Sequence, residues 1–128
     1  MRRTKRTTAL ALLAAALSCA PAWAAPTGAA PAPAPRGDCA PGELCLWPDG
    51  RYGGPRSRYE LTGLVVQDCV RLRGAGSALS LANRLGRPVT VYQSDECEET
   101  GEFETYPGHG TWVPRSPYRV RAFKVWEH

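Results

Sequence analysis

The sequence lacks the motifs by which common enzyme classes are recognised. It has no H-E-x-x-H zinc motif, no phosphate-binding P-loop and no G-x-S-x-G nucleophile elbow. His109 could in principle serve a serine or cysteine, but it lies between two glycines, and we interpret it as a loop residue. The chain is therefore not expected to be an enzyme.

Long apolar runs are also scarce, and the longest uninterrupted one, residues 9–17, is too short to span a bilayer as a helix. It follows a basic start (Arg2, Arg3, Lys5 and Arg6) and precedes an A-x-A site, so residues 1–24 indicate a signal peptide cleaved before Ala25. The protein is expected to be secreted and extracellular, with no membrane attachment after cleavage. Lipidation at Cys19 is the alternative, although Leu17 stands one place away from the position that a lipobox requires.

An excess of basic charge is missing once the signal peptide is removed. The signal segment holds four of the 16 basic side chains, and the remaining 12 balance the 12 acidic ones. A nucleic-acid binder would be expected to keep a basic surplus after processing. We therefore expect no nucleic-acid partner.

The sequence has no Cys-x-x-Cys pair, which is the spacing typical of zinc ligands. The cysteines that remain after Cys19 is removed with the signal peptide are therefore not expected to bind zinc. These four are Cys39, Cys45, Cys69 and Cys97, and an even number in a short secreted chain favours disulfides. Four cysteines allow three pairings. Cys39 with Cys45 would close a small turn, which leaves Cys69 with Cys97. No metal and no cofactor is expected.

Helical periodicity is absent as well, since no stretch carries a long 3.6-residue apolar stripe. Residues 25–37 are rich in proline and alanine and are expected to form an extended linker before one domain, residues 38–128. Within this domain, short alternating runs are separated by glycine and proline, namely residues 58–61, 88–92, 102–106 and 119–126. The pattern predicts an all-β domain.

An approximate internal repeat divides the domain. Cys45-Leu46-Trp47 and Thr90-Val91-Tyr92 stand about 45 residues apart, each with an apolar residue before an aromatic one. Residues 61–63 and 106–108 end in glycine at the same offset, and residues 78–82 and 122–126 close the two halves with alternating apolar side chains. Two four-stranded units packed face to face would explain the repeat.

Trp47, Tyr52 and Gly54 are spaced as an aromatic, four residues, an aromatic, one residue and a glycine. This spacing resembles the βγ-crystallin Greek-key motif, in which a folded hairpin needs the glycine's free φ and two packed rings. Upstream, the stretch CAPGELCLW from Cys39 resembles the opening of the secreted actinobacterial crystallin-like peptidase inhibitors, whose founding member inhibits thermolysin-type metalloproteinases. The resemblance implies two Greek-key units in a small disulfide-stapled βγ-crystallin-like sandwich, and an inhibitor of extracellular (metallo)proteases. We expect the protein to be a monomer.

The second half departs from this motif. Tyr92 is followed by Cys97 where the second aromatic belongs, and the glycine comes late, at Gly101. A disulfide is expected to replace the aromatic pair there. Crystallin-type calcium sites use paired Asn or Asp before a serine, and residues 75–80 contain no carboxylate, so no such calcium site is expected.

Two segments compete as the inhibitory loop. The Cys69–Val70 bond resembles the reactive bond of the founding inhibitor, but Val70 alternates with Leu72 like a buried strand residue. The other segment is the hairpin 93–101, in which Asp95, Glu96, Glu98 and Glu99 surround Cys97. Glu98 and Glu99, which follow Cys97, suit an apolar protease pocket badly. We favour the hairpin as the exposed contact surface, with a target other than a thermolysin-type enzyme.

A non-inhibitory role is the second hypothesis. Aromatic side chains could form a sugar-binding platform for glycan or the cell envelope, with Trp112, expected in a loop, as the best candidate for exposure. A purely structural extracellular module is also compatible with the sequence. The acidic residues around Cys97 could likewise chelate a cation or face a basic partner, but we interpret them as a solvated hairpin whose charges protect a strand edge.

Overall fold

The computed structural model describes residue 15, residues 36–74 and residues 76–128. The expected signal peptide apart from residue 15, its cleavage site, Cys19 and the expected linker as far as residue 35 lie outside the described residues. Arg36 and Gly37 are described, and they already contact the aromatic side chains of the domain. Among the described residues, no helix is long and apolar enough to cross a membrane.

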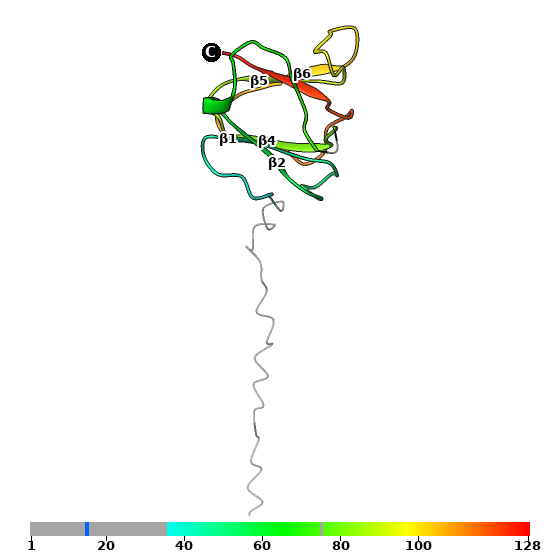
Figure 1. The fold of residues 1–128 in the computed structure, drawn as a ribbon. Helices are drawn as coiled ribbons and strands as arrows, with labels where there is room; N and C mark the ends of the chain where they lie inside the picture. Colours follow the sequence, from blue (N-terminus) through cyan, green and yellow to red (C-terminus); the bar gives the residue numbers. More distant parts are fainter. Residues whose placement is uncertain (1–14, 16–35, 75) are drawn as a thin grey trace, which may run out of the picture. The chain divides into compact units, whose positions relative to one another are not determined.

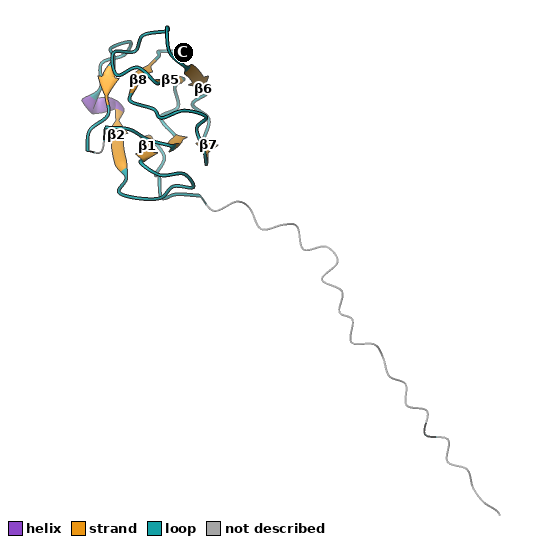
Figure 2. Cartoon of the chain, turned by 90° about the vertical axis from the view of Figure 1, so that its right-hand side faces the viewer, coloured by secondary structure: helices purple, strands orange, loops and turns teal. Residues whose placement is uncertain are grey.

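The described part of the domain is all-β, as the sequence predicts, with two antiparallel sheets of four short strands each (Figure 1). The order of the first sheet is β2 (Ser57–Glu60), β1 (Glu43–Trp47), β4 (Ser80–Asn83) and β7 (Thr111–Val113). The order of the second is β3 (Val70–Arg71), β8 (Ala122–Val125), β5 (Val89–Tyr92) and β6 (Phe103–Tyr106). Loops connect these strands, and the turn η1 (Leu61–Gly63) is the helical element among the described residues (Figure 2).

The two halves of the chain are interlocked. In each unit of four strands, the fourth strand returns to lie beside the first, which is the Greek-key arrangement. The third strand leaves its own unit, so β3 completes the second sheet and β7 completes the first. Each sheet therefore holds three strands of one unit and one of the other, an exchange that the repeat in the sequence does not specify.

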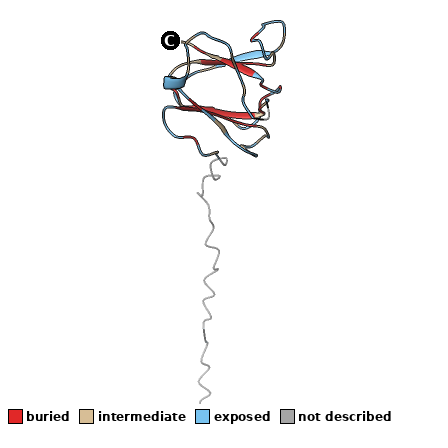
Figure 3. Ribbon diagram, viewed as in Figure 1, coloured by how far each residue is buried: buried red, intermediate tan, exposed pale blue. Residues whose placement is uncertain are grey.

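The apolar core lies between the two sheets and follows from the two-residue period of the strands. Leu44 and Leu46 of β1 face inward and pack with Val89 and Val91 of β5, and all four are essentially inaccessible to solvent. Figure 3 shows this burial along the facing strands, whereas β6 and the hairpin before it are mostly exposed, apart from the buried Cys97. The alternate residues of β1, Cys45 and Trp47, lie on the outer face of the first sheet in a second cluster.

Strand register gives the residue-by-residue equivalence of the two units. Leu46 pairs with Leu81 as Val91 pairs with Phe123, and Trp47 pairs with Ser80 as Tyr92 pairs with Ala122. On the exchanged strands, Leu81 pairs with Val113 as Phe123 pairs with Val70. Stepping one residue back along each exchanged strand, Trp112 corresponds to Cys69.

One expectation about the second unit is wrong. Trp112 was expected in a loop because glycine and proline flank its segment, but it lies in strand β7 and pairs with Ala82 of β4. All three residues of β7 are half-buried, so the strand has no inside–outside alternation by which the sequence could reveal it.

Candidate functional site

The first folded hairpin, residues 48–54 (hairpin 1), is held on the outer face of the first sheet by three aromatic rings. The ring of Trp47 meets Tyr52 edge-on at 5.0 Å between centroids, and Tyr52 meets Trp112 edge-on at 5.8 Å. Edge-to-face contacts of this kind stabilise beyond the area that they bury. Burial raises the pKa of Tyr52, and the nearby Arg36 guanidinium opposes part of that shift.

The backbone of hairpin 1 needs left-handed conformations. Tyr52 has a φ of 60° and Gly54 a φ of 85°. A Cβ at position 54 would lie 2.6 Å from Cγ of Pro48, so only glycine fits where the hairpin folds back. The spacing of Trp47, Tyr52 and Gly54 therefore has the structural role that the resemblance implies.

Ser80 of β4 binds the backbone of hairpin 1 through its hydroxyl. Its hydroxyl is fully buried, accepts a hydrogen bond from the backbone N–H of Tyr52 at 2.9 Å and donates one to the carbonyl of Asp49 at 2.6 Å. The hydroxyl thus satisfies two backbone groups that the sharp bend would otherwise leave unpaired. Sequence reasoning missed this role, because a serine in a strand gives no signal of burial.

The second folded hairpin, residues 93–101 (hairpin 2), occupies the equivalent place on the second sheet. Cys97 takes the place of Tyr52 five residues after the strand aromatic, and its φ of 56° is also left-handed. Cys69, which corresponds to Trp112, is bonded to Cys97 in a disulfide. The sequence predicts that a disulfide of Cys97 replaces an aromatic contact, and the structure shows that this contact is the one between Tyr52 and Trp112 rather than the one between Trp47 and Tyr52.

Arg71 of β3 joins this edge strand to the acidic hairpin. Its Nε donates to the carbonyl of Asp95 at 3.2 Å, and its guanidinium also lies 3.4 Å from the carboxylate of Glu96 and 3.8 Å from that of Asp95. These groups are more than half exposed, so the ion pairs orient the hairpin more than they stabilise the fold. Glu98 and Glu99 are exposed beside the disulfide.

Segment 64–69 reaches the disulfide through a tight turn. The N–H of Asp68 donates to the carbonyl of Val65 at 3.3 Å, and the N–H of Gln67, whose φ is 70°, donates to the carbonyl of Val125 at 2.8 Å. We call the exposed residues of segment 64–69 and of hairpin 2 the stapled surface, since the Cys69–Cys97 disulfide joins the two segments. The two candidate inhibitory loops of the sequence therefore meet at one place.

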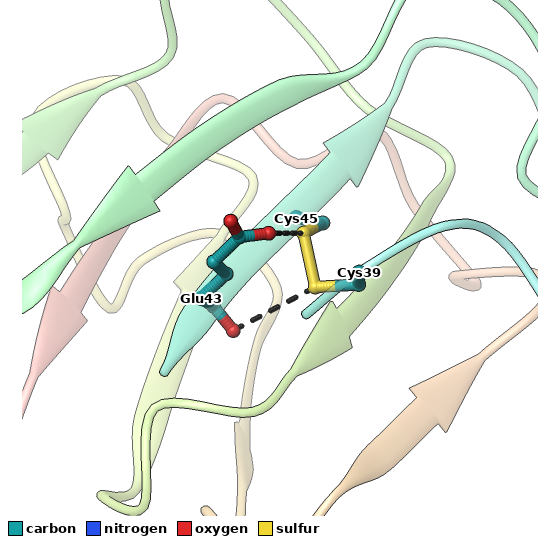
Figure 4. Close-up of side chains that lie close together, drawn as sticks. All are labelled: Cys39, Glu43 and Cys45. Carbon is teal, nitrogen blue, oxygen red and sulfur yellow. Dashed lines mark hydrogen bonds between the residues drawn. A yellow bond between two sulfur atoms is a disulfide. The ribbon is translucent and has the colours of Figure 1, made fainter. Parts of the chain in front are cut away.

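The first disulfide, Cys39–Cys45, lies in a different environment, on the outer face of the first sheet (Figure 4). Oε2 of Glu43 lies 3.5 Å from Sγ of Cys45 and accepts from the N–H of Ala40 at 3.1 Å, while Oε1 pairs with Arg58 at 3.3 Å. The buried carboxylate is thus compensated by a cation and an amide. Cys39, Glu43 and Cys45 lie as close together as metal ligands, but the sulfur atoms are bonded to each other and are not thiolates.

The other candidates of the sequence are placed elsewhere. His109 is exposed at a turn between its two glycines. Trp112 is half-buried, and the guanidinium groups of Arg36 and Arg84 lie 5.3 and 5.9 Å from its ring centre. The aromatic ring that seemed best suited to stack on a sugar therefore already has protein neighbours.

An open groove of about 480 Å³ runs between the edge strands β2 and β3, next to the stapled surface. Three arginines line it, but each has a partner: Arg58 pairs with Glu43, Arg71 with Asp95 and Glu96, and Arg73 lies over the Tyr59 ring at 4.4 Å. Glu60 adds a carboxylate to the lining. The groove therefore offers no strong surplus of positive charge.

The interlocked Greek-key units, the two disulfides and the folded hairpin with its Trp47–Tyr52 clasp define a small disulfide-stapled β-sandwich domain of the βγ-crystallin-like class. Among known families, the model of peptidase inhibitor family I36 matches residues 32–105, which include both hairpins and segment 64–69. The chain belongs to this family of peptidase inhibitors. The family is non-enzymatic, in agreement with the sequence. No curated protein and no solved structure matches the chain.

Proposed function

We propose that the protein is a secreted inhibitor of an extracellular peptidase, with metallopeptidases as the first class to test, and that it binds its target through the stapled surface. Membership of a peptidase inhibitor family supports the inhibitory role. The observation that carries the choice of surface is the Cys69–Cys97 disulfide, which ties two exposed segments to each other above the second sheet.

The stapled surface meets the main physical requirement of a peptidase inhibitor. A loop that enters a protease cleft must not lose much conformational freedom on binding, because that loss weakens the complex. Here the disulfide, the Arg71 contacts and the hydrogen bond from Gln67 to Val125 fix the two segments before any partner arrives. Preorganisation of this kind also slows cleavage of the bound loop.

Of the two loops that the sequence offers, the structure favours exposure at hairpin 2 over the Cys69–Val70 bond. Val70 is half-buried in β3, pairs with Phe123 and packs against the core between the sheets. The Val70 side chain could enter a protease cleft only by leaving this packing. Glu98 and Glu99 of hairpin 2 are instead exposed without such a rearrangement.

A panel assay tests the inhibitory function. The exported domain is titrated against thermolysin, subtilisin, trypsin and papain, which represent metallo-, serine and cysteine peptidases. We expect saturable inhibition of at least one class, weakened in the folded Cys69→Ala/Cys97→Ala variant. Full activity of all four peptidases at an excess of the domain would overturn the proposal.

The role of hairpin 2 is tested by reversing its charge. Glu98→Lys/Glu99→Lys should change the association rate with the target, because charges at an interface act mainly on encounter. Glu127→Lys, a single reversal at an exposed carboxylate outside hairpin 2, is compared with the single variants Glu98→Lys and Glu99→Lys and should leave the rate unchanged. Equal rates for the hairpin 2 variants and the native protein would place hairpin 2 outside the interface.

Secretion is part of the proposal and has its own test. The basic start, the apolar run of residues 9–17 and the A-x-A site support export, and disulfides persist in oxidising compartments. The intact mass of the exported protein should correspond to a chain that starts at Ala25 and has no free thiol. A diacylglycerol mass on Cys19 would instead indicate membrane anchoring.

A further inference from the structure

We infer that Val65 is the side chain that anchors the inhibitor in its target, and that the target pocket accepts an aliphatic residue. This inference rests on the proposed inhibitory function and specifies the stapled surface further. The turn formed by residues 65–68 is then the central element of the contact, and hairpin 2 lies at its edge.

Exposure singles out Val65 among the apolar side chains. Among the described residues, two large hydrophobic side chains are exposed, Val65 at 65% and Phe103 at 44%. Phe103 stacks on Tyr92 with 6.0 Å between ring centroids, so part of its surface is already used by the fold. A single exposed valine is ordinary on a protein surface, and its position must therefore carry the argument.

The backbone on both sides of Val65 is fixed. Before it, Leu61 and Leu64 pack against the core, and the N–H of Leu64 donates to the carbonyl of Leu61 at 3.1 Å. After it, Gln67 is bonded to Val125, and Cys69 is held by the disulfide. An exposed apolar side chain on a segment tied at both ends is the arrangement that a preorganised binding loop requires.

The equivalent turn of the second unit shows that this arrangement is not required by the fold. Counting back from β7 and β3, Gln67 corresponds to Gly110, and both have a left-handed φ, 70° and 82°. Val65 corresponds to Gly108, which is buried, and a Cβ there would lie 2.1 Å from the backbone nitrogen of Arg87. The first unit thus accepts a strained glutamine and presents a valine where the second has two glycines.

The chemistry of the side chain sets the class of target. Valine has no polar atom, so it leaves the hydrogen-bonding groups of a polar or charged pocket without a partner, which weakens binding. A pocket lined by apolar groups gains from the same contact. The peptidases that this protein inhibits should therefore be those that prefer aliphatic residues beside the cleaved bond.

The test compares substitutions at Val65 with a matched substitution at Phe103. Because most of the Val65 side chain is in water, Val65→Asp and Val65→Ile should keep the melting temperature of the native protein. Val65→Asp should raise the inhibition constant by about 100-fold against whichever peptidase of the panel the native protein inhibits, which is the effect of losing a central anchor. Val65→Ile and the control Phe103→Thr should each change it by less than about threefold.

The outcomes separate the two proposals. If the native protein inhibits none of the four peptidases of the panel, the inhibitory function fails and this inference fails with it. If the native protein inhibits a peptidase and Val65→Asp inhibits it equally well, the function stands and the inference alone is overturned. If the native protein inhibits only trypsin, whose specificity pocket carries a carboxylate, the inference that the target pocket accepts an aliphatic residue would also be overturned.

Discussion

Hairpins 1 and 2 make the same bend at equivalent places with different chemistry. Hairpin 1 is held by the rings of Trp47, Tyr52 and Trp112 and by the Ser80 hydroxyl, which stands between the N–H of Tyr52 and the carbonyl of Asp49. In hairpin 2, Ala122 has no hydroxyl, and the N–H of Cys97 bonds directly to the carbonyl of Ser94 at 3.4 Å.

The comparison shows that a bend shared by both units can be stabilised in a way that leaves more of the hairpin surface free. In hairpin 1, the bend depends on several buried non-covalent contacts, each of which constrains the residues nearby. In hairpin 2, the disulfide takes the place of the buried contact between Tyr52 and Trp112, and several of the remaining positions carry exposed charges such as Glu98 and Glu99. Hairpin 2 is therefore the one whose surface can be adapted to a partner without loss of the fold.

Removing the Cys69–Cys97 disulfide should have the largest effect on stability. Cys69→Ala/Cys97→Ala opens a loop with a sequence separation of 28 residues and should lower the free energy of unfolding by about 3–4 kcal/mol in the chain-entropy model. Denaturant unfolding of the non-reduced proteins measures the loss.

The matched control opens the other disulfide. Cys39→Ala/Cys45→Ala removes a link with a separation of only six residues, for which the same model gives about 2 kcal/mol. An equal or larger loss from the control would mean that loop entropy does not explain how hairpin 2 is held.

Ser80→Ala should have the next largest effect. It leaves the N–H of Tyr52 and the carbonyl of Asp49 without their shared partner, which should lower the free energy of unfolding by about 1–3 kcal/mol. The reverse change, Ala122→Ser, adds a hydroxyl where the two backbone groups already bond each other and should not stabilise the protein. A clear gain for Ala122→Ser would show that hairpin 2 also lacks a hydroxyl that it needs.

The contact between Tyr52 and Trp112 is smaller and needs a double-mutant cycle. The coupling energy from Tyr52→Ala, Trp112→Ala and the double variant should be about 0.5–1.5 kcal/mol, as for other edge-to-face aromatic pairs. Thermal or denaturant unfolding of the four proteins gives this value. If the two single-variant losses in free energy of unfolding add up to the loss of the double variant, the rings do not interact specifically. The disulfide of hairpin 2 would then not take the place of a stabilising ring contact.

Calcium should have no effect on either hairpin. A ligand that binds only the native state raises the melting temperature, and residues 75–80 offer no carboxylate to a cation. The melting temperature in millimolar calcium should equal that in a chelator. A clear rise would mean that the acidic residues of hairpin 2 hold an ion.

Much of the framework could be predicted from the sequence because it depends on local spacing. The five-residue step from Trp47 to Tyr52 and from Tyr92 to Cys97 identified both bends, and the cysteine count left few pairings for the structure to choose from. Alternating runs located β5 and β6 to within a residue.

The features that could not be predicted depend on contacts between distant segments. A repeat along the chain does not say which sheet a strand joins, so the exchange of β3 and β7 was not visible. Nothing in the sequence distinguishes Ser80 from other serines in strands. Its role depends on the backbone groups of Asp49 and Tyr52, which the fold brings within hydrogen-bond distance. The role inferred for Val65 depends on its exposure to solvent. The sequence alone suggests the opposite, because apolar residues are usually expected to be buried.

The exchange of third strands also determines when the chain can fold. Synthesis proceeds from the N-terminal end. The first sheet therefore lacks its edge strand until β7 has been synthesised, and β3 lacks its pairing partner until β8 has been synthesised. Pairings between such distant segments form slowly and late. The nascent chain therefore stays without its native tertiary structure through most of translation.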